Sequence, residues 1–594
     1  DLGLGYLTLG EGTPALAEVS AAAGTALPAA VDGVITLENG TYVMSEDTTA
    51  TIKVPNGKNA TLDLNGKTLT NKTGEHTIIV ENGATLTITG NGIVDNVSHG
   101  KGAIVNSGEV TLNGGTFKRS AENGIYSPYG NGGNSWYTIA NYGTMEINTG
   151  VTVKNAGGYS SMIRNGGEAT ADCNLTIRGG NFTGGINTVK NDRFGVLTIN
   201  GGNFSNTAQY VIMNWNKAEI TAGTFQTLDT ASAVLFTSAY DSDANTVGNL
   251  TISGGEFKRA SDTQEMIVDH YDASNSGTAT VTGGKFDADI SKYIPTDYVQ
   301  SADGTVEKLG ETNAVAKVGG TYYKTLADAV AAAQDGDTIT LLKDAELTST
   351  LNLAKNITID GQGKYTIKAA NSFTVGSDNK TYCVLYVSGE VTLKDVTVNG
   401  NEKCRVIFCD KGKLTIDGAT ITNGKAPNFI GGVYMTSSAS FEMKSGSITG
   451  NKNAKEYQND EYLQYSSDLW IGANANGALT AINGGTIGNV FVNANAWSAS
   501  NPGSFTMNGG TVTNLYVEHD ANYGATFKYN DGTIEHLYLS KENGNGQSIE
   551  VTPVKGVIYN GGVKEEDLVT LTLKYNDGAT ADTTYNVASG TTLT

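Results

Sequence analysis

The stretch Leu-Thr-Ile-Asn-Gly-Gly-Asn-Phe at residues 197–204 carries the pattern that decides the fold of this chain. Two apolar residues stand two positions apart, a Gly-Gly turn follows, and another apolar residue comes five positions after the second. Close copies occur at residues 175–182 and 250–257, and weaker ones run from Leu64/Leu69 to Tyr529/Ile534. A short repeated unit of this kind cannot bury its own apolar face, so we expect the repeats to stack as a solenoid.

The interval between successive apolar residues after the turn varies along the chain. It is 21 residues from Phe204 to Phe225 but 39 residues from Ile448 to Ile487. A left-handed hexapeptide helix needs a nearly fixed coil, whereas variable coils with extruded loops are typical of the right-handed parallel β-helix. We therefore predict an all-β fold, a right-handed parallel β-helix solenoid whose apolar residues point inward and whose glycines turn the backbone.

The repeats fall into two sets, which predicts two consecutive β-helical bodies, each opened by a short capping helix that covers the first coil. The second helix is the clearer one, because Thr325 and Asp328 form a capping pair and apolar residues recur at helical spacing. The expected organisation is an N-terminal segment with a capping helix at 1–32, a first β-helix at 33–289, a linker at 290–322, a second β-helix with its capping helix at 323–563, and a last segment at 564–594.

Composition excludes several classes of partner. The net charge of −21 repels nucleic acid and anionic membrane surfaces, so we expect neither nucleic-acid binding nor membrane insertion. Arginine is scarce, which disfavours a bidentate clamp on carboxylates. The cysteines fit neither a disulfide scaffold nor a zinc module. We expect buried thiols, with a bridge from Cys383 to Cys404 or Cys409 as the alternative.

Two segments carry a resemblance to known families. Thr325-Leu326-Ala327-Asp328-Ala329-Val330 with Asp337-Thr338-Ile339-Thr340-Leu341 resembles the opening of right-handed β-helices of the pectate-lyase-like superfamily, and more closely of large surface proteins of gut Gram-positive bacteria. The tail from Thr570-Leu571-Thr572-Leu573 to Leu593 resembles the start of a Listeria–Bacteroides β-grasp repeat. The resemblance implies an extracellular protein, secreted or attached to the cell wall, and the abrupt ends suggest a piece of a longer chain.

The catalytic motifs of β-helical enzymes are missing from the sequence. A polygalacturonase-like site would show Asn-Thr-Asp, paired Asp, Gly-His-Gly and Arg-Ile-Lys in successive coils, and none of these is present. Of a pectate-lyase-like site, only Val268-Asp269-His270 is similar to the relevant strand. His519, Asp520 and His536 come nearest to a metal cluster, but their coil phases differ. We therefore expect no catalytic residue, no metal site and no cofactor, and we keep calcium open as a partner of turn aspartates.

Two aromatic-rich insertions interrupt the repeat and give the candidate ligand-binding residues. Exposed aromatic rings on loops of a rigid scaffold commonly grip sugars or protein partners. The alternative is that these rings fold back and cover the flank of the solenoid. Asn214, Trp215 and Asn216 form a third, weaker candidate. The candidates in the two insertions are Tyr126, Tyr129, Trp136, Tyr137, Tyr457, Tyr462, Tyr465 and Trp470.

Two functions follow from different classes. The first is a non-enzymatic extracellular surface protein, an adhesin or adhesin stalk, that binds a host or environmental glycan or protein. The second is a β-helical polysaccharide lyase or glycoside hydrolase with an unrecognised site. Convergent Asp, Lys or Arg on three stacked coils would favour the enzyme, whereas a flat surface lined by Thr and Asn with projecting aromatic loops would favour the adhesin. Fold alone does not decide between them.

Overall fold

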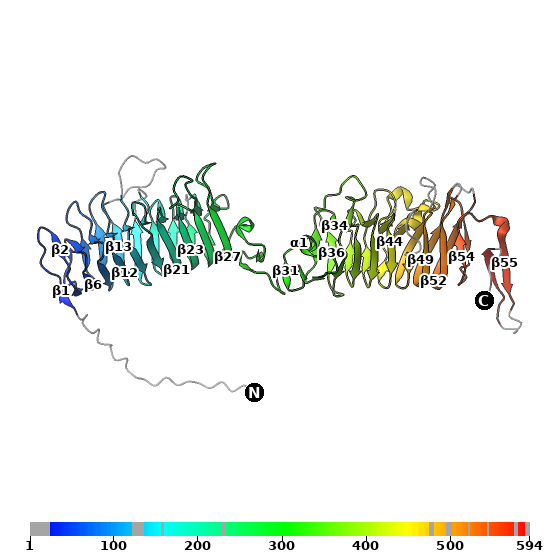
Figure 1. Cartoon of the computed structure of the whole chain (residues 1–594), viewed down its shortest axis with the longest axis horizontal. Coiled ribbons are helices and arrows are strands. Elements are labelled where there is room, and N and C mark those ends of the chain that lie inside the picture. Colours follow the sequence, from blue (N-terminus) through cyan, green and yellow to red (C-terminus); the bar gives the residue numbers. More distant parts are fainter. Residues whose placement is uncertain are drawn as a thin grey trace, which may run out of the picture. The chain divides into compact units, whose positions relative to one another are not determined.

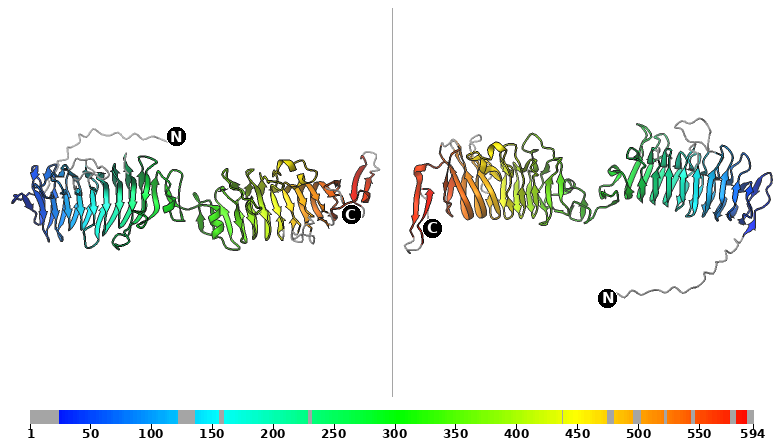
Figure 2. Two further views of the ribbon diagram at one scale, coloured as in Figure 1. Left: turned by 90° about the horizontal axis from the view of Figure 1, so that it is seen from above. Right: turned by 180° about the vertical axis from the view of Figure 1, so that it is seen from behind.

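The computed structural model describes a chain of two compact units, Asp1–Lys308 and Leu309–Thr594. The described residues are 24–121, 136–155, 160–228, 232–436, 438–473, 480–494, 502–520, 523–542, 546–574 and 580–588. The N-terminal segment 1–32, expected to hold the first capping helix, is described only from residue 24 onward. In each unit the strands stack one after another into a parallel β-helix, as the sequence predicts (Figures 1 and 2). Within the described residues, no helix is long and apolar enough to span a membrane.

In the first unit, every turn of the chain adds a strand to a ten-stranded parallel sheet, here called the ten-strand wall. The rest of each coil belongs to a seventeen-stranded parallel sheet. The strands of the ten-strand wall are β2 (Val34–Thr36), β5 (Thr51–Val54), β8 (Ile78–Val80), β11 (Ile104–Asn106), β14 (Ile139–Asn141), β17 (Ile163–Asn165), β20 (Asn187–Asn191), β22 (Tyr210–Asn214), β24 (Ala233–Thr237) and β26 (Glu265–Val268). The later strands of the larger sheet are β18 (Cys173–Ile177), β19 (Asn181–Gly184), β21 (Gly195–Asn206), β23 (Lys217–Thr227), β25 (Asn249–Lys258) and β27 (Thr278–Phe286).

The apolar residues of the repeat form the core of the first unit. The phenylalanines after the glycine turns stack in one column, with successive ring centroids 4.5–4.9 Å apart and nearly parallel planes. Gly202 has φ +109°, and a Cβ there would lie 3.1 Å from the Phe204 ring, so the turn before each ring requires glycine. The predicted inward positions are all buried, which confirms the repeat: Leu112, Phe117, Ile177, Phe182, Ile199, Phe204, Ile252 and Phe257.

A second column inside the first unit consists of asparagines, which the sequence pattern did not predict. Their side-chain amides donate from coil to coil over 2.7–2.9 Å. Each remaining N–H reaches a backbone carbonyl, so buried amides are satisfied without water. Asn214, one of the weaker ligand candidates, ends this interior column and is fully buried. The members of the column are Asn106, Asn141, Asn165, Asn191 and Asn214.

Part of the predicted linker belongs to the first unit. Its residues form the 3-10 helix η1 (Ser291–Tyr293) and a hairpin of β28 (Tyr298–Gln300) and β29 (Val306–Lys308). Ile290 and Val306 join the first hydrophobic core. Pro295 therefore lies within a cap over β27 rather than in a free connection. No described strand pairs between the two units.

In the second unit, β30 (Ala316–Val318) and β31 (Thr321–Tyr323) precede α1 (Leu326–Ala332), the capping helix expected near the start of the second β-helix. Thr325 accepts a hydrogen bond from the backbone N–H of Asp328, and Leu326, Ala329 and Val330 are buried. One row of strands in this unit, here called the aromatic wall, presents aromatic residues outward. Its strands are β34 (Leu351–Leu353), β37 (Cys383–Val387), β40 (Arg405–Cys409), β43 (Val433–Met435), β46 (Leu469–Ile471), β48 (Thr486–Val492), β49 (Ser504–Val517) and β52 (Thr526–Ser540).

The C-terminal end of the second β-helix is closed by antiparallel strands. β53 (Ser548–Val551) and β54 (Ile558–Asn560) pair with β52 and so protect its edge. A separate antiparallel hairpin of β55 (Leu568–Leu573) and β56 (Thr583–Ala588) follows, and its relation to a β-grasp repeat stays a prediction. All cysteines are free and buried, so the alternative of a disulfide bridge is wrong. Burial raises the pKa of the Cys383 thiol to about 12.

Candidate ligand-binding surfaces

The second aromatic insertion does not project from the solenoid. Trp470 lies in β46, where it is 6% exposed, and its ring stacks on Phe491 with centroids 4.3 Å apart. Phe491 stacks in turn on Tyr516 at 5.0 Å. These rings belong to one outward column in register along the aromatic wall: Tyr386, Phe408, Tyr434, Trp470, Phe491, Tyr516 and Tyr538.

The segment before β46 covers this column. Tyr462 lies 5.9 Å from the Tyr516 ring, and Tyr465 stacks on Tyr538 at 4.6 Å. Tyr457 meets Phe429 edge to face at 5.9 Å. The insertion is therefore the lid of a small satellite core, as the alternative from the sequence has it. Tyr457, Tyr462 and Tyr465 are half-buried, and Trp470 is the least accessible of the four.

The first aromatic insertion is described only at its end. Tyr126 and Tyr129 lie outside the described residues. Trp136 and Tyr137 are half-buried, and the Trp136 ring lies 4.5 Å from that of His76. Burial, together with the nearby Lys101 and Arg119 charges, lowers the pKa of His76 to about 4. Trp136 therefore packs against the coils in the same way as the rings of the second unit.

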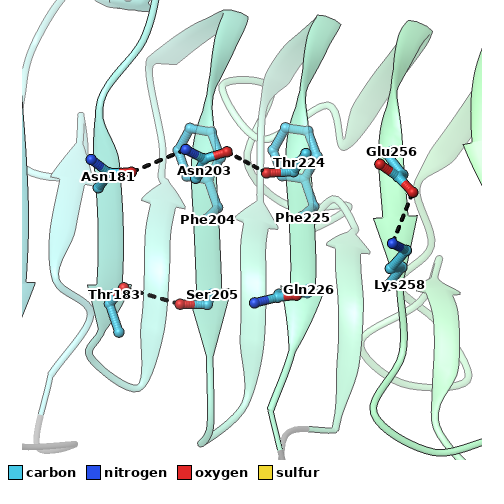
Figure 3. Close-up of a pocket in the computed structure, with 10 residues that line it drawn as sticks. All are labelled: Asn181, Thr183, Asn203, Phe204, Ser205, Thr224, Phe225, Gln226, Glu256 and Lys258. Atoms are coloured by element: carbon cyan, nitrogen blue, oxygen red, sulfur yellow. Dashed lines mark hydrogen bonds and ion pairs between the residues drawn. The ribbon is translucent and has the colours of Figure 1, made fainter. Parts of the chain in front are cut away.

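A shallow polar depression of about 390 Å³ lies on the seventeen-stranded sheet of the first unit (Figure 3). Stacked strands β19, β21, β23 and β25 supply its lining, because side chains on either side of the inward phenylalanines point outward. None of the candidates predicted from the sequence lies in this depression, although the polar residues that flank each phenylalanine could have indicated it. The outward lining residues are Asn181, Thr183, Asn203, Ser205, Thr224, Gln226, Glu256 and Lys258.

The polar groups of the depression form rows along the stack. Asn203 donates to the Asn181 amide oxygen over 3.0 Å and accepts from the Thr224 hydroxyl over 2.6 Å. Thr183 and Ser205 share a hydrogen bond of 3.0 Å. Hydroxyl and amide groups repeated at the strand spacing of about 4.8 Å offer donors and acceptors to an extended hydroxyl-rich ligand.

The only acidic group lining the depression is not placed for proton transfer. Lys258 pairs with Glu256 at 2.9 Å, and this hydrogen bond lowers the pKa of the Glu256 carboxyl. A general acid needs the opposite shift, and glycoside hydrolysis needs a second carboxyl across the groove. The depression therefore has the chemistry of a binding surface.

A charged cluster lies on the ten-strand wall. The Asp192 carboxylate accepts from Arg164 Nε at 3.1 Å and from Lys190 Nζ at 2.9 Å. Burial acts to raise the pKa of Asp192, but Lys190, the Arg193 backbone and Arg164 together hold it below its usual range. Arg164 and Lys190 are in register on adjacent coils, and the next coil presents Met213. Convergent charges therefore span two coils in this row, short of the three that would favour an enzyme.

Asp269 and His536, singled out in the sequence analysis, contact neighbouring side chains. Lys292 Nζ lies 2.6 Å from the Asp269 carboxylate, which also contacts His270. His536 is in register with Asn514 rather than His519, and it contacts Glu550 at 2.7 Å. No group of three or more His, Cys, Asp or Glu side chains suited to a metal ion occurs in the described part of the chain.

These features define the class of the molecule as a parallel β-helical solenoid with a polar, in-register outer surface. No family model matches the chain, and no curated protein matches it. Among solved structures, the PL6 family alginate lyase AlyGC is similar over 85% of this chain and 94% of its own, with 11% identity and a TM-score of 0.18. At that TM-score the likeness carries no argument about activity, and the fold rests on the strand pairing described above.

Proposed function

We propose that this protein is a non-enzymatic extracellular surface protein, an adhesin or part of an adhesin, that binds glycan through the polar depression. The observation that carries the proposal is the row of hydrogen-bonding side chains repeated across four stacked strands. Sugar hydroxyls both donate and accept, so they match amide and hydroxyl groups better than a row of fixed charges.

The depression also favours one ligand orientation. Its hydrogen-bonded rows run from strand to strand, and three intervals of about 4.8 Å give a lining about 14 Å long. A glycan chain that runs along the stack contacts equivalent side chains on each coil. A glycan chain that runs along one strand contacts the side chains of a single coil only. Affinity should therefore rise with oligosaccharide length until the ligand spans the depression and then level off.

The test is a glycan array probed with the full chain, its Asn203→Ala variant and a matched control. Asn508→Ala is the control, because Asn508 sits in an equivalent outward row of the second unit, donating to Asn483 and accepting from Asn530 at 2.8 Å each. Loss of a net hydrogen bond of about 1 kcal/mol should weaken binding roughly fivefold in Asn203→Ala and leave Asn508→Ala unchanged. Equal loss in both variants would contradict the proposal.

The second candidate function is a lyase or hydrolase, for which the Asp192 cluster on two coils is the nearest candidate site, and a parallel assay separates the two functions. The glycans that bind are incubated with the protein, and the release of new sugar ends is measured. No release is expected. Release that disappears in Lys190→Gln but persists in Asn203→Ala would establish the enzyme and assign its chemistry to the ten-strand wall.

A further inference from the structure

Another cluster of aromatic residues follows successive strands of the ten-strand wall. Trp215 directly follows β22, whereas Tyr240 and Tyr271 stand three residues after the ends of β24 and β26, so one ring is added by each coil. Trp215 is 4% exposed, Tyr240 is 37% exposed and Tyr271 is 55% exposed. The two tyrosines are the most exposed aromatic side chains among the residues that the structure describes.

The three rings are packed into a fixed arrangement. The Tyr240 ring lies flat on Trp215, with centroids 4.5 Å apart and planes at 8°. Tyr271 meets Trp215 edge to face at 5.3 Å and Tyr240 at 5.5 Å. Phe236 supports Trp215 from within the wall at 4.9 Å. The buried indole is therefore the base on which the two exposed phenol rings rest.

Backbone hydrogen bonds hold the two tyrosines in place. The Tyr240 N–H donates to the Thr246 hydroxyl over 3.0 Å. The Tyr271 N–H donates to the Ser238 hydroxyl over 3.1 Å and to the Asn275 carbonyl over 2.9 Å. Rings ordered before a ligand arrives lose little conformational entropy on binding. An exposed ring that is already fixed is therefore better suited to binding than a freely rotating one.

The surroundings of the rings are polar. Asp241 and Asp272 directly follow Tyr240 and Tyr271 in the chain, and both are exposed. The Asp272 carboxylate binds the Asn275 side chain at 2.9 Å. Carboxylates at this rim can accept hydroxyl protons, and they repel an anionic sugar. The net charge of the chain acts in the same direction.

We propose that Tyr240 and Tyr271 form a second carbohydrate site, an aromatic platform in which the more exposed Tyr271 ring stacks on the apolar face of a neutral pyranose ring while the Tyr240 ring, inclined to it at 65°, flanks the sugar. The rim carboxylates accept hydrogen bonds from the equatorial hydroxyls of that ring. The inference extends the proposed function, since it places a second glycan site apart from the polar depression and names its ligand as neutral. The comparison with the second unit supports it: an inserted lid covers the outward rings of Phe491 and Tyr516 there, whereas these two are open to solvent.

The test is calorimetric titration of the full chain with cellotriose, maltotriose and chitotriose, and with trigalacturonate as the anionic counterpart. Tyr271→Ala should weaken one neutral-sugar binding event at least tenfold, while Tyr271→Phe keeps it because the ring remains. The melting temperature of Tyr271→Ala should stay close to that of the wild type, because the ring is largely exposed and its backbone bonds remain. Asn203→Ala is the control for the depression.

The outcomes separate the two proposals. Two binding events, one lost in Tyr271→Ala and the other in Asn203→Ala, support both. One event that survives Tyr271→Ala but not Asn203→Ala overturns the platform and leaves the proposed function standing. One event with the opposite pattern supports the platform and overturns the depression. No binding of any neutral sugar, or tighter binding of trigalacturonate that depends on Tyr271, overturns the platform as proposed here.

Discussion

Replacement of Phe204 by alanine tests the stacked core of the first unit. The ring is 1% exposed and lies between Phe182 at 4.6 Å and Phe225 at 4.9 Å. Buried Phe→Ala substitutions destabilise by about 3–5 kcal/mol. We expect the upper end of that range, because two aromatic contacts are lost at once and the rigid coils above and below cannot close the cavity.

The assay is differential scanning calorimetry of the full chain. A loss of about 4 kcal/mol should lower the melting temperature of the first unit by roughly 10 °C and leave the transition of the second unit unchanged. Phe204→Leu is the matched control, since it refills much of the volume without stacking and should lose less than half as much. A loss below about 1 kcal/mol in Phe204→Ala would refute the reasoning, because the ring would then not be part of a packed column.

Further predictions concern single side chains in both units. Asn165→Ala should destabilise the first unit by about 2–4 kcal/mol in urea unfolding, because neighbouring amides of the interior column lose their partner. Trp470→Ala should lower the melting temperature of the second unit, and an unchanged melting curve would contradict its place in the satellite core. Burial raises the pKa of Glu518 from 4.5 to about 7, so the folded state holds a proton that the unfolded state releases, and stability should fall as the pH rises from about 4.5 to 7. Glu518→Gln should abolish that fall. The lowered pKa of His76 acts oppositely: stability should fall as the pH drops from about 6.5 to 4, and His76→Gln should remove this dependence.

The fold was predictable because one short pattern carries it. Leu197, Ile199 and Phe204 keep fixed offsets from the glycine turn, and their neighbours in the next coil do the same, so register follows directly from the sequence. The interior asparagines were not predictable in this way. Asparagine is also common in turns, and only the stacking of coils shows that the amides of Asn165 and Asn191 face each other inside.

The candidate surfaces were harder to predict from the sequence than the core. Trp470 was assigned to an insertion because the interval around it is long, yet the short strand Leu469–Ile471 keeps it in register with Tyr434. Asp192 and Arg164 are 28 residues apart and come together only because they lie on adjacent coils. Outward-facing residues follow no fixed sequence pattern, because many different side chains are tolerated in contact with solvent. Their pairing across coils can be seen only in the folded structure.

Several outward aromatic residues are buried in the second unit, whereas two are exposed in the first, and this difference bears on function. In the second unit the outward rings form one in-register column, and an inserted lid covers its later part, where Phe491 and Tyr516 are completely buried. Leaving such a column exposed would create an apolar patch prone to association. In the first unit Tyr240 and Tyr271 pack on a buried Trp215 but stay uncovered, and each is followed directly by an exposed aspartate. If these rings served only to pack the core, covering them would stabilise the protein. The exposed pair with its polar rim is therefore better explained by a bound ligand than by a purely structural role.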